Sequence, residues 1–95
     1  MKMYIFTITY NFDGDYIAQK FNTFTAAFLM LEKMLKTEVE TVRNECEYEP
    51  SVIRFADDDV CLIYEEDVTL ENHTEFTKSD TAYYRIFEVE VWLWQ

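Results

Sequence analysis

One amphipathic stretch interrupts a chain that otherwise reads as strands, and this arrangement constrains the fold most strongly. Its apolar side chains recur at the i, i+3, i+4 spacing of a helix, at Phe24, Ala27, Phe28, Leu31, Leu35 and Val42. Asn22 or Thr23 can cap the first turn, and we expect the helix to run to about Asn44. The stripe therefore predicts a helix with one face packed on a second layer.

Segments rich in β-branched and aromatic residues flank the predicted helix on both sides. Met3–Tyr10 and Tyr16–Phe21 are expected to form a hairpin around a turn at residues 11–15. The strands expected after the helix are Ser51–Ala56, Val60–Glu65, a short edge strand Val68–Leu70 and a long final strand Thr81–Trp94. This order predicts a single α+β domain over residues 1–95, with one helix packed on an antiparallel sheet of about four to six strands.

The composition favours a folded protein in a reducing compartment. Hydrophobic residues make up 49% of the chain and aromatic residues 18%, which is unlike a disordered protein. Cys46 and Cys61 form no CxxC pair and no signal peptide pattern is present, so we expect reduced thiols and a cytoplasmic location. The longest uncharged run, Phe21–Leu31, is too short to span a bilayer, so no membrane association is expected.

The charge of the chain is segregated. Residues 1–37 carry three acids and four bases, whereas residues 38–90 carry sixteen acids and four bases, a net charge of −12 within a total of −11. Such a protein is repelled by nucleic acid and by anionic membranes, so basic protein surfaces are its expected partners.

The acidic residues are spaced in a way that can imitate nucleic acid. Carboxylates two residues apart on a strand project from one face at about 6.6 Å, close to the phosphate repeat of a single DNA strand. We expect Glu45, Glu47 and Glu49 in an extended segment, and Glu88 and Glu90 on the same face of the final strand as Ile86, with Phe87 on the other. The predicted partner-binding residues are Glu45, Glu47, Glu49, Asp57, Asp58, Asp59, Glu65, Glu66, Asp67, Glu88 and Glu90.

Two alternatives to this interpretation stay open. The carboxylates can instead form an ordinary solvated surface that keeps the protein in solution. Trp92 and Trp94 follow Glu88 and Glu90 on one face of the predicted strand, where they either extend a binding strip or lie buried under a second layer. Burial is favoured for these tryptophans because large aromatic residues are mostly covered.

Catalytic and metal sites find little support. Cys46 is surrounded by glutamates that raise a thiol pKa, Cys61 lies in an apolar run, and His73 is the sole histidine, so a Cys–His enzyme is not expected. Asp13-Gly14-Asp15 and Asp57-Asp58-Asp59 are oxygen-rich turns without the spacing of a calcium loop. We therefore expect no cofactor, no metal and no enzymatic activity, with a small metal-dependent enzyme as the last alternative.

The chain resembles a known class of proteins in its size and in the placing of its acids, not in an alignable motif. These acids lie in residues 38–49, 57–59 and 65–75 and at Glu88 and Glu90. In size and charge it resembles the small acidic phage-encoded inhibitors that act as DNA mimics, including anti-CRISPR proteins. The resemblance implies a non-catalytic inhibitor, a monomer or homodimer, that occupies the basic groove of a DNA- or RNA-processing protein. It also implies action in the host cytosol, with an RNA-guided nuclease as one possible target.

A different class of function is the alternative. A self-associating structural or adaptor domain would use an apolar patch of Leu29, Met30, Trp92 and Trp94, and its acidic surface would serve solubility alone.

Overall fold

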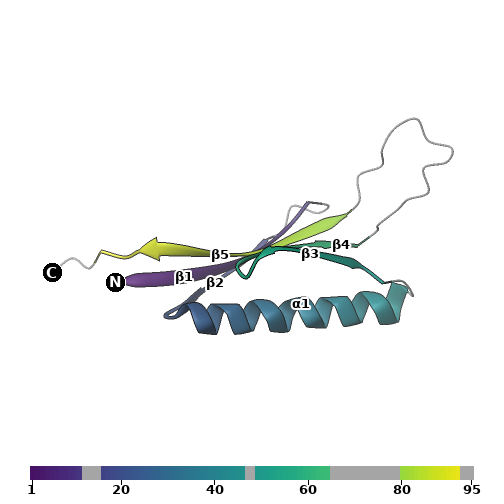
Figure 1. Ribbon diagram of the computed structural model, residues 1–95, viewed down its shortest axis with the longest axis horizontal. Helices are drawn as coiled ribbons and strands as arrows, with labels where there is room; N and C mark the ends of the chain where they lie inside the picture. The colour runs from purple at the N-terminus through teal and green to yellow at the C-terminus, as the bar shows by residue number, and fades with distance from the viewer. Residues whose placement is uncertain (12–15, 47–48, 65–79, 93–95) are drawn as a thin grey trace, which may run out of the picture.

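The computed structural model describes residues 1–11, 16–46, 49–64 and 80–92. Its elements, in chain order, are β1 (Lys2–Tyr10), β2 (Tyr16–Phe21), α1 (Phe24–Cys46), β3 (Ser51–Ala56), β4 (Asp59–Ile63) and β5 (Thr81–Glu90). The strands form one antiparallel sheet in the order β2-β1-β5-β4-β3, and α1 lies along one face of that sheet (Figure 1). The predicted α+β architecture is confirmed.

Two hairpins and a central closing strand generate the sheet. β1 pairs with β2, and β3 pairs with β4, as their short connections favour. β5 then inserts between the hairpins, with Phe6 opposite Ile86 and Val60 opposite Tyr84. The edge strands of the described sheet are therefore β2 and β3.

The helix begins where the sequence places a capping residue. The Thr23 hydroxyl accepts a hydrogen bond from the Ala26 N–H at 3.1 Å, and the Thr23 carbonyl accepts one from the Ala27 N–H. Val42 is buried in the penultimate turn, which holds the helix on the sheet as far as Cys46. Glu45 therefore lies in the helix, and the expectation of an extended segment at this residue is wrong.

The core lies between α1 and one face of the sheet. Alternate residues of the central strands point at the helix, as the two-residue period of a strand requires. The buried cluster consists of Phe6, Ile8, Ala27, Leu31, Leu35, Val60, Leu62, Ala82, Tyr84 and Ile86. Four of the six residues of the predicted helical stripe are buried, and Phe28 packs against the cluster from its margin.

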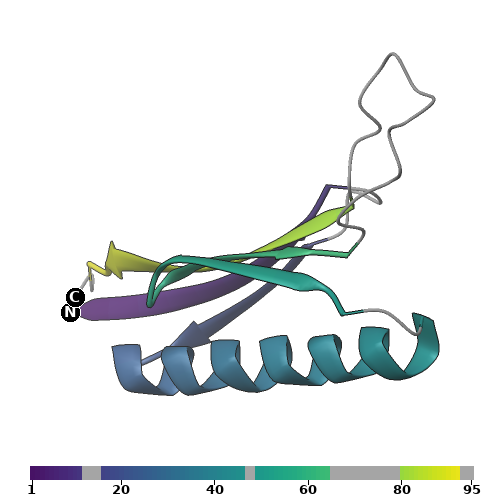
Figure 2. The ribbon, with the colours of Figure 1, turned by 45° about the vertical axis from the view of Figure 1, so that its right-hand side comes forward.

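The opposite side of the sheet, here named the open face, has no helix over it in the described part of the chain (Figure 2). Residues of the other strand parity lie on this face, and Phe87 among them is 49% exposed. The predicted alternation of the last strand is therefore correct, because Ile86 is buried under α1 and Phe87 is not.

The structure changes several predicted boundaries and one expected burial, and β4 ends at Ile63 rather than Glu65. Asp59 belongs to β4, so the turn between β3 and β4 consists of Asp57 and Asp58. β5 ends at Glu90 rather than Trp94, since Glu90 pairs with Lys2 at the start of β1 and only one further hydrogen bond follows, from Val91 N–H to the Met1 carbonyl at 2.7 Å. Trp92 is 78% exposed, so its expected burial is wrong. The predicted strand Val68–Leu70, together with His73 and Trp94, lies outside the described residues.

Candidate partner-binding site

The turn between β3 and β4 lies beside the C-terminal half of β5, so four predicted acidic residues lie toward the same end of the sheet. The Asp58 carbonyl accepts a hydrogen bond from the Ile86 N–H at 3.1 Å, which fixes the turn against β5. Glu88 and Glu90 follow on β5, and the side chains of all four acids are exposed. We name Asp57, Asp58, Glu88 and Glu90 the acidic end.

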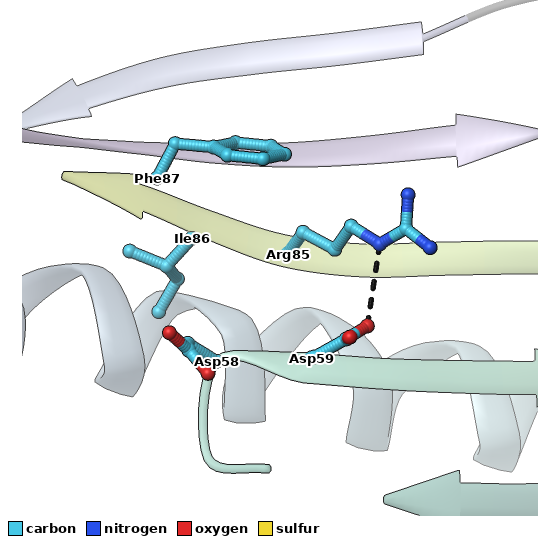
Figure 3. A pocket seen from close by; sticks show the side chains of 5 residues that line it. All are labelled: Asp58, Asp59, Arg85, Ile86 and Phe87. Carbon is cyan, nitrogen blue, oxygen red and sulfur yellow. Dashed lines mark hydrogen bonds and ion pairs between the residues drawn. The ribbon is translucent and has the colours of Figure 1, made fainter. Parts of the chain in front are cut away.

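Asp59 is the first residue of β4, next to the acidic end, and its charge is neutralised by Arg85 of the same chain. Its Oδ1 accepts a hydrogen bond from Arg85 Nε at 3.2 Å (Figure 3). The Arg85 guanidinium also lies 4.8 Å from the centre of the Tyr83 ring, a cation–π contact. Asp59 therefore orders the base of the turn and is less available to a partner than Asp57 or Asp58.

Residues of the turn, β4 and β5 line a shallow hollow of about 320 Å³. Asp58 and Asp59 line one side, and Arg85, Ile86 and Phe87 line the other (Figure 3). It presents carboxylates beside a half-exposed aromatic ring. A partner's guanidinium can pair there with Asp58, because Asp59 is already paired with Arg85.

The edge of β5 beyond the turn presents its backbone as well. Ile86 directs its N–H toward β4, so the N–H groups of Glu88 and Glu90, at the same strand parity, point to the same side. β4 ends at Asp59 opposite Arg85, and no described strand pairs with this side of residues 87–90. The acidic end therefore combines carboxylates with a short open strand edge.

Glu88 and Glu90 make ion pairs that water weakens. Glu88 lies 3.5 Å from Lys2 Nζ, and Glu90 lies 3.3 Å from the amino group of Met1. All four groups are more than half exposed, and such surface pairs contribute only about 0–1 kcal/mol each. A partner's arginine or lysine can replace them at small cost.

Two predicted contacts lie at the opposite end of the molecule. Glu45 is in the last turn of α1, and Glu49 precedes β3. β3 separates them from the acidic end by about 20 Å, since a strand rises about 3.3 Å per residue. Arg43 grips Glu49 with two hydrogen bonds of 2.6 and 2.7 Å, and this pairing lowers the pKa of the Glu49 carboxyl. Glu47, Glu65, Glu66 and Asp67 lie outside the described residues.

Exposed aromatic residues accompany the acidic end, and the sequence prediction missed two of them. Phe55 is 64% exposed where the β3–β4 register shifts, and Phe87 lines the hollow. Trp92 follows β5 and is exposed. The alternation of the final strand does separate Phe87 from the core, but nothing in the sequence marks the irregularity at Phe55.

The remaining chemistry-bearing groups are buried or dispersed. Cys61 is 5% exposed, and this burial raises the pKa of its thiol, partly offset by a hydrogen bond with Tyr83. Within residues 1–11, 16–46, 49–64 and 80–92, no three His, Cys, Asp or Glu side chains gather as metal ligands would. A second groove of about 410 Å³ runs between α1 and Val52 of β3, with Glu32, Lys36 and Arg43 along it.

Comparison with protein families, with curated proteins and with solved structures finds no match for this chain. No helix in the described part of the chain has enough apolar length to cross a membrane. The function must therefore be argued from the site itself.

Proposed function

We propose that this protein binds, without catalysis, the basic nucleic-acid groove of a DNA- or RNA-processing protein and blocks it. The observation that supports the proposal is that four exposed acids, Asp57, Asp58, Glu88 and Glu90, lie toward one end of the sheet. The proposal is narrower than the prediction from sequence, because Glu45 and Glu49 lie at the other end.

Carboxylates at the acidic end would take the place of phosphates. Arginine and lysine side chains that normally contact a nucleic-acid backbone form charge-assisted hydrogen bonds with carboxylates just as well. The net charge of −11 would steer such a partner from a distance and accelerate the encounter. Trp92, which is exposed, would supply an aromatic contact that distinguishes one basic groove from another.

An RNA-guided nuclease is one target of suitable chemistry. Its guide–target channel is positively charged, and arginines read the short duplex motif beside the target. Action in the cytosol of a bacterial host is part of this proposal.

Capture from a bacterial lysate tests the proposal with a matched pair of variants. D57N/D58N removes two charges at the acidic end, whereas E40Q/E45Q removes two exposed charges from α1. Both variants have the same net charge, so a loss confined to the first reports the position of the charge and not its amount. We expect immobilised wild-type protein and E40Q/E45Q to retain a nucleic-acid-binding protein that duplex DNA elutes, and D57N/D58N to lose it.

Equal retention by the two variants would contradict the proposed site, and equal loss would leave only nonspecific charge attraction. A captured protein that duplex DNA fails to elute would contradict occupancy of a nucleic-acid groove.

A further inference from the structure

The open face contrasts in charge with the rest of this acidic protein. Its described ionisable acids and bases are Lys20, Asp59 and Arg85, and Asp59 and Arg85 neutralise each other. The face therefore has a net charge of +1 within a chain of −11. A surface with so few carboxylates is where two copies of an acidic chain can approach without strong repulsion.

The residues of this face line up in rows that cross the strands, with exposed apolar side chains at the outer strands. One row runs across all five strands as Tyr16, Thr9, Tyr83, Cys61 and Ile53. Both of its ends are open, because Tyr16 is 67% exposed and Ile53 is 43% exposed. The apolar groups thus extend to both edges of the face.

The dimensions of the open face match those of a stable interface. Five strands at about 4.8 Å spacing make it about 24 Å wide, and Thr81 to Val89 at about 3.3 Å per residue make it about 26 Å long. The flat footprint is about 600 Å², and the relief of the side chains increases the accessible area toward the roughly 800 Å² per partner of a standard interface.

We propose that two copies of this chain pack open face to open face, about a two-fold axis that runs along β5. This axis carries β2 of one copy over β3 of the other, so Tyr16 lies over the partner's Ile53. Lys20 pairs across the sheet with Ile5, which in turn pairs with Phe87. At this height along the strands, Lys20 of one copy lies over the end of β3 in the other copy, next to that copy's Asp57. The contact thus packs Tyr16 of one copy on Ile53 of the other and brings Lys20 of one copy close to Asp57 of the other.

The proposed arrangement has a consequence for the acidic end. Rotation about an axis parallel to the strands keeps the strand direction, so both acidic ends lie at the same end of the dimer. Sheets packed face to face are about 10 Å apart, so the two β3–β4 turns would lie close together, whereas the side chains of Glu88 and Glu90, on the same face as Ile86, would point away from the interface.

Sedimentation equilibrium of the full chain tests the dimer. We expect the wild type to reach about twice its 11.5 kDa mass at micromolar concentration, with little change when salt rises to about 0.5 M. I53E and Y16E should each raise the dissociation constant at least about tenfold. L29E adds the same charge at a residue of α1 that is 61% exposed, and it should leave the dimer intact.

Zero-length amine–carboxylate cross-linking tests the axis. Within one chain, Lys20 and Asp57 lie on or beside opposite edge strands, four strand spacings or about 19 Å apart, so a direct cross-link between them must join two copies. We expect this cross-link by mass spectrometry in the wild type and its loss in I53E, with circular dichroism showing that the variant is folded. A monomeric wild type, a dimer that L29E dissociates and I53E does not, or a dimer without the Lys20–Asp57 cross-link overturns the proposal.

Discussion

Replacement of Arg85 and Asp59, singly and together, measures what their ion pair contributes to the turn at the acidic end. The two side chains are 44% and 39% exposed, so solvent screening limits their pairing to about 0.5 kcal/mol. The contact of Arg85 with the Tyr83 ring adds about 0.5 kcal/mol at an exposed position. R85M retains the apolar stem and loses both interactions, and D59N loses only the pair.

We therefore expect unfolding free energies lower by about 1 kcal/mol for R85M and by about 0.5 kcal/mol for D59N. The double variant should lose about 1 kcal/mol, which leaves a coupling energy of about 0.5 kcal/mol. Urea denaturation measures all four corners of the cycle, and R85M should melt about 5 °C below the wild type. A coupling energy above about 1.5 kcal/mol would refute the reasoning, because it requires a pair shielded from water.

Three other predictions follow from buried groups. L31A should cost about 3 kcal/mol of unfolding free energy in urea, since Leu31 is 0% exposed, and L29A should change it by less than about 0.5 kcal/mol. Iodoacetamide at about pH 8 should alkylate Cys61 far more slowly in the folded protein than in the unfolded protein, because the thiol is buried and its pKa is raised. Peptide mapping measures the rate at Cys61, and equal rates in the two states would contradict its burial. Burial raises the pKa of Tyr64 and Tyr84 above the unfolded value of about 10. The unfolding free energy is therefore fully retained below about pH 10 and falls as the pH rises from there toward the higher pKa values of the folded state. Urea midpoints that stay constant from about pH 9 to 11 would contradict the tyrosine result.

The local elements could be predicted because their signals are local. The helical spacing of Ala27, Leu31 and Leu35 identifies the face that packs on the sheet, and Thr23 marks where the helix begins. The hairpin of β3 and β4 follows from two short apolar runs around an acidic turn. Each of these features depends on side chains only a few residues apart.

The arrangement of the acids could not be predicted, because it depends on the strand order. β5 is distant in sequence from both of its neighbours, yet its insertion between β1 and β4 brings Glu88 to the turn at Asp57 and Asp58. The continuation of α1 through Glu45 likewise depends on the burial of Val42. Tertiary packing decides both, and alternation of charge along the chain does not reveal it.

The most direct test of the account asks whether a captured partner can hold this protein and nucleic acid together. A fluorescent duplex is titrated into that partner at increasing concentrations of the wild-type chain. Occupancy of the nucleic-acid groove by the acidic end predicts an apparent dissociation constant for the duplex that rises in proportion to the chain, without a plateau. D57N/D58N should lose the effect and E40Q/E45Q should retain it. A plateau, a ternary complex or an unchanged affinity for the duplex would contradict the account.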